Sequence, residues 1–236
     1  MKIISFNVAG MQQALKKGLK DMLLRESPDI ICLQEVKSKS MEDVFELDGY
    51  HIYWNFAERN GYSGTALFTK IKPEAIKTFK SDIEGRIIHA RYEKFHLVNV
   101  YVPNSKSGLV RLDERLEWDQ KLRDYVTSLN PILNKIIICG DFNVTCDEID
   151  VWKLNPKNAG SSPKERASFK KWFELGFHDV FRALYKDKVQ YTYYDYKFKD
   201  KGWRLDYFLV SDMNGIKDHM ILKDKMSDHR AIMMIM

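Results

Sequence analysis

The chain has 236 residues, a length that fits one large α/β domain, residues 1–236, better than two small ones. Hydrophobic residues make up 44% of it, enough for a substantial core, and the formal net charge of +5 mildly favours acidic partners such as nucleic acid. The N-terminus lacks the apolar stretch of a signal peptide, and no apolar run approaches the ~20 residues that span a bilayer. We therefore expect a cytoplasmic protein without a membrane partner.

Strand-like stretches dominate the first half of the chain, with helical patterns between them. The predicted elements, in order, are a strand at 2–8, an amphipathic helix at 12–25, a buried strand at 30–33, a short helix at 41–47, strands at 50–54 and 65–69 around a turn at 60–64, and strands at 86–92 and 95–102.

The second half begins with the longest helical pattern, whose charged face is most simply a solvated surface. Ser162 and Glu165 form a capping box around a proline, which predicts the start of another helix. The elements predicted here are a helix at 110–129, a strand at 136–139, a surface loop at 146–162, a helix from 163, and strands at 190–194, 203–210 and 231–235.

Together these elements predict a four-layer α/β sandwich, in which two mainly antiparallel sheets pack face to face between flanking helices. The three cysteines are odd in number and lack the spacing of metal ligands. We expect buried thiols in a reducing compartment at these positions, Cys32, Cys139 and Cys146.

The rest of the chain is organised around the stretch from Ile136 to Asn143. Its four apolar residues predict a strand buried on both faces, and Gly140 interrupts the pattern. Asp141 and Asn143 follow, and on an extended backbone they point to the same side. Such a carboxylate and amide are suited to holding a water and a phosphate oxygen together, although a strand that ends in a polar turn explains the pattern equally well.

Polar residues also close other predicted strands, and such strand ends gather at one edge of a sheet. Nearly all of these residues offer oxygen, which favours a hard cation such as Mg²⁺ over zinc. A neighbouring Asp and His near the C-terminus offer general acid–base chemistry, so the set fits phosphoester hydrolysis. A structural role is the simpler explanation for His229 taken alone. The set is Asn7, Glu35, Tyr101, Asp141, Asn143, Asp206, Asp228 and His229.

Eight motifs, distributed along the chain in family order, resemble the exonuclease III family of apurinic/apyrimidinic endonucleases, within the endonuclease/exonuclease/phosphatase superfamily. They are Ile4-Ser5-Phe6-Asn7-Val8, Leu33-Gln34-Glu35-Val36-Lys37, Gly61-Tyr62-Ser63-Gly64, Glu84-Gly85-Arg86, Asn99-Val100-Tyr101-Val102-Pro103-Asn104, Gly140-Asp141-Phe142-Asn143, Gly202-Trp203-Arg204-Leu205-Asp206-Tyr207 and Ser227-Asp228-His229.

The resemblance implies a role for each polar residue. Glu35 matches the principal metal ligand, with Asn7 and Asp228 close to the metal. Asp141 matches the residue that positions the attacking water. The remaining matches are Asn143 and Tyr101 on the scissile phosphate, His229 as the histidine that contacts the phosphate, and Asp206 as the partner of that histidine.

The resemblance also implies how DNA is recognised, with the baseless sugar turned out of the duplex into a small apolar pocket. Trp203, Leu205 and Tyr193 match the pocket positions, although each aromatic residue alone is more commonly a core residue. The candidates for phosphate contacts are Lys37, Arg86, Asn104, Arg111 and Asn158, with a surface ion pair as the alternative for Arg111.

Several positions depart from the family pattern without touching the catalytic set. Ala9 replaces an acid or amide beside the metal, Gln12 replaces a basic residue, and Ser107 occupies the place of an arginine that some relatives insert into DNA. These departures bear on the affinity for DNA and on the balance between endonuclease and exonuclease activity.

The resemblance implies a monomeric, Mg²⁺-dependent DNA repair enzyme, with Mn²⁺ as an alternative ion. It would cut duplex DNA 5′ to an abasic site to leave a 3′-hydroxyl, and would act on 3′-blocked ends by 3′-5′ exonuclease or 3′-phosphodiesterase activity. Three alternatives stay open: a phosphodiesterase of the same superfamily with another substrate, an endonuclease that also cuts at damaged bases, and an inactive nucleic-acid-binding module.

Overall fold

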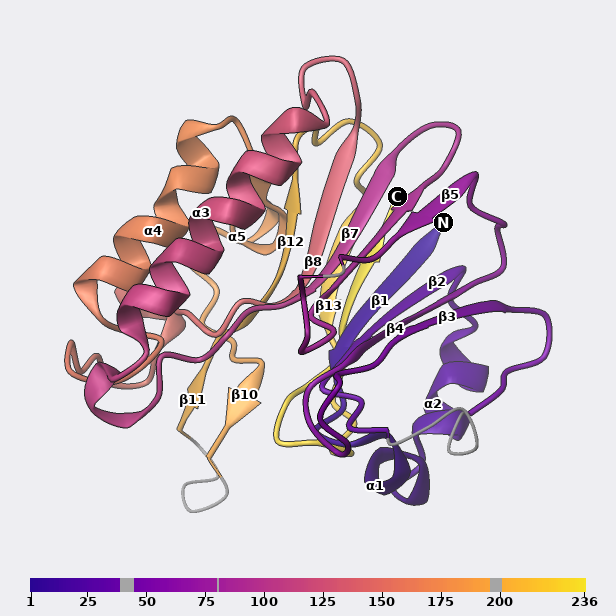
Figure 1. Ribbon diagram of the computed structural model, residues 1–236, viewed down its shortest axis with the longest axis horizontal. Helices are drawn as coiled ribbons and strands as arrows, with labels where there is room; N and C mark the ends of the chain where they lie inside the picture. The colour runs from indigo at the N-terminus through magenta and orange to yellow at the C-terminus, as the bar shows by residue number, and fades with distance from the viewer. Residues whose placement is uncertain (39–44, 80, 196–200) are drawn as a thin grey trace.

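The computed structural model describes residues 1–38, 45–79, 81–195 and 201–236. Two six-stranded sheets lie face to face at its centre (Figure 1). The first sheet has the order β13-β14-β1-β2-β4-β3. Its strands are β13 (Asp218–Ile221), β14 (Ile232–Ile235), β1 (Lys2–Asn7), β2 (Ile30–Gln34), β4 (Thr65–Thr69) and β3 (His51–Asn55).

The second sheet has the order β5-β6-β7-β8-β12-β9, and a two-stranded ribbon, β10-β11, lies beside it. Its strands are β5 (Ala75–Lys77), β6 (Ile87–Arg91), β7 (His96–Tyr101), β8 (Ile136–Asp141), β12 (Asp206–Val210) and β9 (His178–Asp179), and the ribbon strands are β10 (Tyr193–Tyr194) and β11 (Gly202–Trp203). Within the two sheets only the pairs β1–β2 and β7–β8 are parallel, so both sheets are mainly antiparallel, as predicted.

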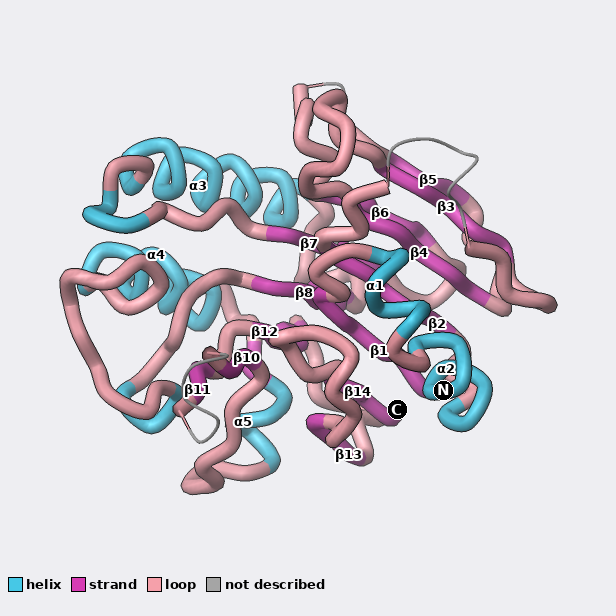
Figure 2. The backbone as a smooth tube through the Cα atoms, turned by 90° about the horizontal axis from the view of Figure 1, so that it is seen from below, coloured by secondary structure: helices cyan, strands magenta, loops and turns pink. Residues whose placement is uncertain are grey.

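Helices cover the outer face of each sheet and complete the four layers. The helices α3 and α4 lie over the second sheet, and α1 and α2 lie beside the first (Figures 1 and 2). The helices are α1 (Met11–Lys16), α2 (Leu19–Glu26), α3 (Leu112–Ser128), α4 (Pro163–Glu174) and α5 (Val180–Leu184), with short 3-10 helices η2 (Ser107–Leu109) and η3 (Glu148–Asp150).

Three apolar clusters separate these layers, which explains why so many strands are hydrophobic on both faces. One cluster lies between the sheets and includes Ile3, Cys32 and Cys139. The second joins the first sheet to α1 and α2, and the third joins the second sheet to α3 and α4. All three cysteines are buried free thiols, as predicted.

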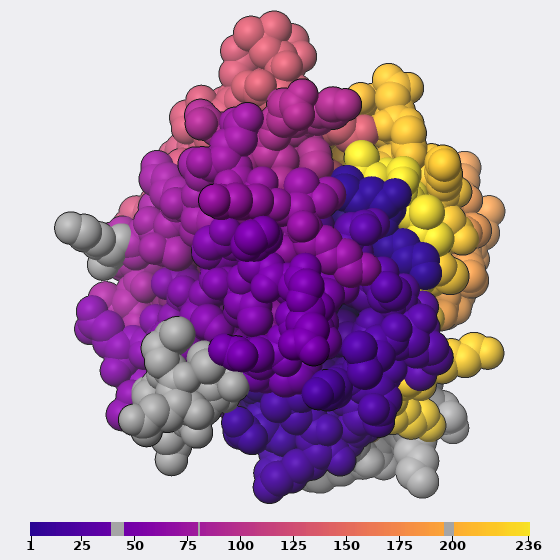
Figure 3. All heavy atoms as spheres, turned by 90° about the vertical axis from the view of Figure 1, so that its right-hand side faces the viewer, coloured from indigo at the N-terminus to yellow at the C-terminus, as the bar shows by residue number. Residues whose placement is uncertain are grey.

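The face turned away from α3 and α4 is formed mainly by the first hundred residues (Figure 3). C-terminal residues, drawn in yellow, lie there beside the indigo N-terminal strand. This neighbourhood follows from the antiparallel pairing of β1 with β14, in which Lys2 lies opposite Ile235. Both termini lie at the end of the sandwich opposite to α1 and the ribbon (Figure 1).

Several predicted elements differ from the structure, and the strand predicted at 190–194 is limited to β10 (Tyr193–Tyr194). The helix predicted at 12–25 is two helices, because Gly18 adopts a left-handed conformation (φ 97°) between α1 and α2. The strand predicted at 203–210 is interrupted between β11 and β12. The short helix predicted at 41–47 lies partly outside the described residues, and residues 45–47 are not helical.

The charged face of α3 is only partly a solvated surface, contrary to the prediction. Arg115, Asp119 and Arg123 are all buried under 10% exposure. Arg115 donates from Nε to Asp119 (2.8 Å), and Arg123 donates to the carbonyl and hydroxyl of Ser168 on α4. An ion pair within α3 and hydrogen bonds of Arg123 and Asp119 with Ser168 satisfy these charges, and spacing along one helix does not reveal the contacts with α4.

Candidate active site

Asp141 is the last residue of β8, and the backbone around it depends on the preceding glycine. Gly140 has φ +145°, and a Cβ atom there would lie 1.8 Å from the carbonyl oxygen of Val100 on the neighbouring strand. Only glycine permits this approach. The approach leaves Asp141 1% exposed at the strand end, and burial raises the pKa of its carboxyl to about 7.

Two amides hold the Asp141 carboxylate. Asn7, at the end of β1 in the other sheet, donates from Nδ2 to Oδ2 (2.9 Å), and the backbone N–H of Asn143 donates to Oδ1 (2.8 Å). The prediction that the backbone is extended through residue 143 is wrong, because β8 ends at Asp141 and Asn143 has φ 49°. The two side chains nevertheless meet, since Asn143 Nδ2 lies 3.4 Å from Asp141 Oδ2.

His229 lies between two buried carboxylates. Its Nδ1 is 2.8 Å from Oδ2 of Asp206, and its Nε2 is 3.8 Å from Oδ2 of Asp141. The antiparallel register of β12 and β8 brings Asp206 opposite Asp141. Burial disfavours the imidazolium, but the Asp206 and Asp141 carboxylates outweigh it and raise the pKa of His229 to about 10. The histidine is therefore a cation that Asp206 orients.

Glu35 follows β2 at the same rim, with its side chain 20% exposed. Its left-handed backbone (φ 55°) turns the chain, so that its carbonyl accepts the N–H of Gly10 (2.9 Å). Oε1 of Glu35 is 2.7 Å from Nζ of Lys37. Non-glycine residues rarely adopt positive φ, and Ala9, Glu35 and Asn143 all do so here, a concentration of backbone strain typical of functional sites.

Tyr101 lies at the end of β7 and is kept in its neutral form. Burial and then the charges of Glu35 and Asp141 raise the pKa of its phenol well above the usual value, so the hydroxyl stays a donor. Arg86 stacks on this ring, with its guanidinium carbon 4.5 Å from the ring centroid, and donates to the Tyr101 carbonyl (2.8 Å). Arg86 is only 3% exposed, so the structure places it beneath Tyr101.

The other candidates for phosphate contacts differ in position. Asn104 is partly buried and donates from Nδ2 to Oδ1 of Asn143 (3.0 Å), which joins it to the catalytic cluster. Arg111 lies 2.8 Å from Glu114, so the surface ion pair considered as its alternative is present. Asn158 is exposed in the loop before α4 and lines a pocket beside Trp203. The phosphate contacts themselves stay predictions.

Asp228 is half-buried next to His229, and its Oδ1 accepts the hydroxyl of Ser227 (3.0 Å). The aromatic pair predicted for the sugar pocket is adjacent. The ring centroids of Tyr193 and Trp203 are 5.8 Å apart, and the Tyr193 ring lies 5.1 Å from that of His229. Leu205 is buried (5% exposed), directly before Asp206. These residues thus gather at one place, and their roles in DNA recognition stay predictions.

Sequence reasoning missed three residues, of which Thr192 and Arg115 support the site and Trp152 lies near Trp203. Thr192 is fully buried, and its hydroxyl accepts the N–H groups of Leu205 (2.9 Å) and Asp206 (3.1 Å). Arg115 donates to the carbonyls of Pro103 and Phe142 (2.8 Å each), which fixes two site loops. Trp152 is half exposed in a segment predicted only as a loop. A tryptophan beside lysine in a polar loop is the one sequence signal for it.

Oxygen donors at this rim suit a divalent metal ion. Asp141, Asp206 and His229 place ligand atoms within 4.8 Å of one another. The Nδ1 atom of His229 is already engaged by Asp206, however, and the imidazolium already supplies positive charge between the two acids. Glu35, Asn7 and Asp228 offer oxygen without a histidine, which fits a hard cation better.

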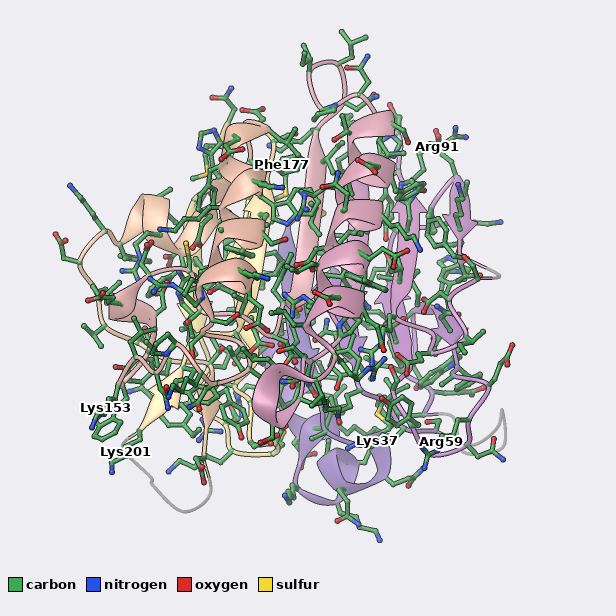
Figure 4. The ribbon with its side chains drawn as sticks, turned by 60° about the vertical axis from the view of Figure 1, so that its left-hand side comes forward. Lys37, Arg59, Arg91, Lys153, Phe177 and Lys201 are labelled. Carbon is green, nitrogen blue, oxygen red and sulfur yellow. The ribbon has the colours of Figure 1, made fainter. Side chains whose placement is uncertain are left out.

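Basic side chains flank the rim on both sides. In Figure 4, Lys37 and Arg59 lie toward one side of this rim, and Lys153 and Lys201 lie toward its other side. Arg91 and Phe177 lie at the end of the molecule opposite to the rim. On the described part of the chain, no helix is long and apolar enough to cross a membrane.

Two stacked sheets with a buried Asp–His–Asp cluster at one rim form the arrangement of a phosphoester hydrolase. The chain belongs to the endonuclease/exonuclease/phosphatase family, whose model matches residues 4–229. It is 40% identical over its full length to an exodeoxyribonuclease of Bacillus subtilis, of which the match covers 99%. It is 42% identical, over 98% of its length, to the DNA repair nuclease APEX1 of Danio rerio, with 81% of that protein covered.

Solved structures agree in fold. An AP endonuclease from Archaeoglobus fulgidus superposes with a TM-score of 0.87 at 28% identity, covering 100% of this chain and 98% of that one. The two packed sheets are therefore those of the family, as the sequence motifs indicated.

Proposed function

We propose that this chain is a DNA repair nuclease that hydrolyses the phosphodiester 5′ to an abasic site in duplex DNA and leaves a 3′-hydroxyl. Removal of 3′-blocking groups and 3′-5′ exonuclease action use the same bond chemistry. The observation that carries the proposal is the position of His229 between Asp206 and Asp141, 2.8 and 3.8 Å away. The names of full-length relatives, an exodeoxyribonuclease and a DNA repair nuclease, supply the substrate class.

The chain's own residues supply a path for in-line hydrolysis. Asp141, held by Asn7 and Asn143, orients a water toward phosphorus and accepts its proton. The water oxygen bonds to phosphorus as the bond to the 3′ oxygen breaks, and that oxygen takes up a proton to become the 3′-hydroxyl. His229, as a cation, stabilises the negative charge that develops on the phosphate oxygens, and the neutral Tyr101 hydroxyl donates to them.

Glu35, Asn7 and Asp228 are the residues that hold Mg²⁺ in this proposal, with Mn²⁺ as an alternative ion. The ion supplies Lewis-acid charge that offsets the negative phosphate. Ala9 contributes no side-chain ligand, and its backbone N–H instead donates to Oδ1 of Asn7 (3.0 Å), which fixes the amide.

The DNA-binding surface is the rim between the two groups of basic side chains (Figure 4). Positive charge on either side of the site suits a duplex whose backbone crosses it. Trp203, Tyr193 and Leu205 receive the baseless sugar in this proposal, which gives a reason for the aromatic ring contact beside His229. A base paired in the helix has no route to that position without leaving the stack.

The test is a nicking assay on abasic plasmid and on intact plasmid, with Mg²⁺ and with EDTA. Nicking of only the abasic plasmid, only with the metal, supports the proposal. Binding of the abasic plasmid without any nicking of it would favour the inactive nucleic-acid-binding module. A panel with a uracil duplex, a 3′-blocked nick and a non-nucleic phosphodiester separates the broader endonuclease and the phosphodiesterase with another substrate.

A further inference from the structure

A pocket of about 480 Å³ lies between the loop before α4 and the ribbon β10-β11. It shares Tyr193 and Trp203 with the proposed sugar site, and extends away from that site along the loop. The remaining walls come from Trp152, Lys153, Leu154, Asn155, Pro156, Asn158, Asp195, Lys201 and Gly202. Its volume is in the range of ~300–1,000 Å³ typical of sites for small organic groups.

The walls combine aromatic and basic side chains. Trp152 is 49% exposed, and Nζ of Lys201 lies 4.1 Å from the centroid of its ring. Lys153 and Lys201 lie together at this corner of the molecule (Figure 4). An exposed indole beside ammonium groups matches a nucleotide, whose flat base stacks on the ring while the cations meet its phosphate.

The indole is held in place by the backbone around it. Val151 pairs with Trp203 as an isolated bridge, and the N–H of Trp152 donates to the carbonyl of Gly202 (2.9 Å). Behind them, the fully buried Asp150 accepts from Nε of Arg204 (2.8 Å). Trp152 and Trp203 are therefore parts of one braced unit, so a group bound at one is placed relative to a group bound at the other.

Amide groups at the far wall suit the edge of a base. Asn155 donates from Nδ2 to Oδ1 of Asn158 (3.2 Å), and Oδ1 of Asn155 accepts the N–H of Lys157 (3.0 Å). The two side chains thus brace each other at the pocket edge. The Asp195 carboxylate, also in the lining, offers an acceptor for the amino groups of a base.

On the basis of the proposed function, we infer that this pocket binds one unstacked nucleobase that neighbours the abasic position. The base stacks on Trp152, and Lys153 and Lys201 contact its phosphate. The extra contact makes the enzyme bind a lesion more tightly when the unpaired neighbouring nucleotide carries a base than when it carries none.

The test measures equilibrium binding in EDTA, by fluorescence anisotropy, of duplexes that carry a tetrahydrofuran abasic analogue. The neighbouring nucleotide is either a mispaired thymidine or a second tetrahydrofuran, placed on the 5′ and the 3′ side in turn. The wild type should bind the thymidine duplex about fivefold or more tightly on one side, because stacking of one base on an aromatic side chain supplies this much. Trp152→Ala should abolish the preference, and Trp152→Phe should keep most of it.

Two lysine variants distinguish contacts to the nucleobase from contacts to its phosphate. Lys201→Met should weaken binding of both duplexes by a similar factor, because both keep the phosphate. Lys157→Met, in the same loop but outside the pocket lining, is the matched control and should change neither.

Retention of the thymidine preference by Trp152→Ala would overturn the inference. This outcome includes equal weakening of both duplexes by Trp152→Ala, which leaves the preference unchanged and would show that the pocket holds backbone and not a base. Thermal unfolding of each variant checks that it is folded, and Trp152→Leu, which keeps an apolar side chain but no ring for stacking, carries the test if Trp152→Ala is not folded. Incision of a single abasic site in paired DNA with Mg²⁺ is measured in parallel: its failure in the wild type refutes the proposed function, whereas normal incision without any base preference refutes only this inference.

Discussion

Asn7 donates a hydrogen bond of 2.9 Å from Nδ2 to Oδ2 of Asp141, across 134 residues of sequence and from one sheet to the other. Both side chains are buried, at 0% and 1% exposure. The site is thus assembled only when the two sheets pack in register, and the bond couples the predicted metal ligand to the residue predicted to orient water.

Removal of this bond tests the coupling. Asn7→Ala should slow incision of an abasic duplex about a hundredfold, since Asp141 loses the donor that orients it, and Asp141→Asn should cost more. Because the two residues act as one unit, the double variant should be little slower than Asp141→Asn alone. Single-turnover rates at saturating enzyme give the comparison. Fully additive losses would show that the two side chains act independently.

The Asp206–His229 pair gives a second prediction. His229→Gln removes the cation from the phosphate and should reduce the incision rate by ~10²–10⁴-fold. Asp206→Asn keeps the imidazole of His229 but removes the carboxylate that orients it, so it should cause a smaller loss of incision rate. Rates are measured with binding in EDTA as the companion readout. Equal losses in affinity and rate would assign the pair to substrate binding instead.

The dependence of activity on a metal ion gives a third prediction. EDTA should abolish nicking, and added Mg²⁺ should restore it. Glu35→Gln should raise the Mg²⁺ concentration needed for half-maximal activity at least ~tenfold, because a charged ligand is lost. Glu117→Gln, an exposed acid on α3, is the matched control. If Glu35→Gln titrates like the wild type while Asp206→Asn shifts the curve, the ion is held by the Asp141–Asp206–His229 group.

Two ion pairs of different burial give a prediction about stability. Asp150 is fully buried and pairs with Arg204 and Arg182, so Asp150→Asn should lower the free energy of unfolding by about 3–5 kcal/mol. Asp147 and Lys170 are nearly half exposed at the same distance, 2.8 Å, and Asp147→Asn should cost less than about 1 kcal/mol. Urea unfolding measures both, and equal effects would contradict the role given to burial.

His219 makes stability fall with acid. It is 3% exposed, and burial followed by the charge of Arg204 lowers the pKa of its imidazole to about 3. In the unfolded chain it titrates near its ordinary value of 6.5. Its stabilising effect is complete above pH 6.5 and is lost at about 1.4 kcal/mol per pH unit between 6.5 and 3, where only the unfolded state gains the proton.

Unfolding free energies of the wild type and His219→Phe from pH 7 to pH 4 provide the measurement. The variant should lose less stability on acidification, because its ring has no proton to bind. Parallel curves for the two proteins would show that other groups cause the whole dependence.

Local patterns predicted much of this molecule. The capping box at Ser162 and Glu165 begins α4, and both of its reciprocal hydrogen bonds are present. The apolar run before Gly140 is a strand buried on both faces. Such features depend on residues that are near each other in sequence, so their signal is readable there.

Features that depend on distant partners were missed. The burial of Arg115 and the half-exposed Trp152 each follow from what packs against them, whereas the break at Gly18 follows from its own left-handed backbone, which the helical spacing did not reveal. Arg86, which matched a DNA-contact position, stacks on Tyr101 and is buried, and its charge did not predict that burial. Charge alone does not tell a buried arginine from an exposed one.

The sequence by itself determined the membership of the family, the class of fold and the residue types of the site, because motifs and periodicities are local chemical properties. Only the tertiary structure decided that Asn7 and Asp206 meet Asp141 and His229 at one rim, and that Trp152 extends the pocket beside them. The reason is that sheet register and loop packing are set by long-range contacts, which carry no signature in any single segment.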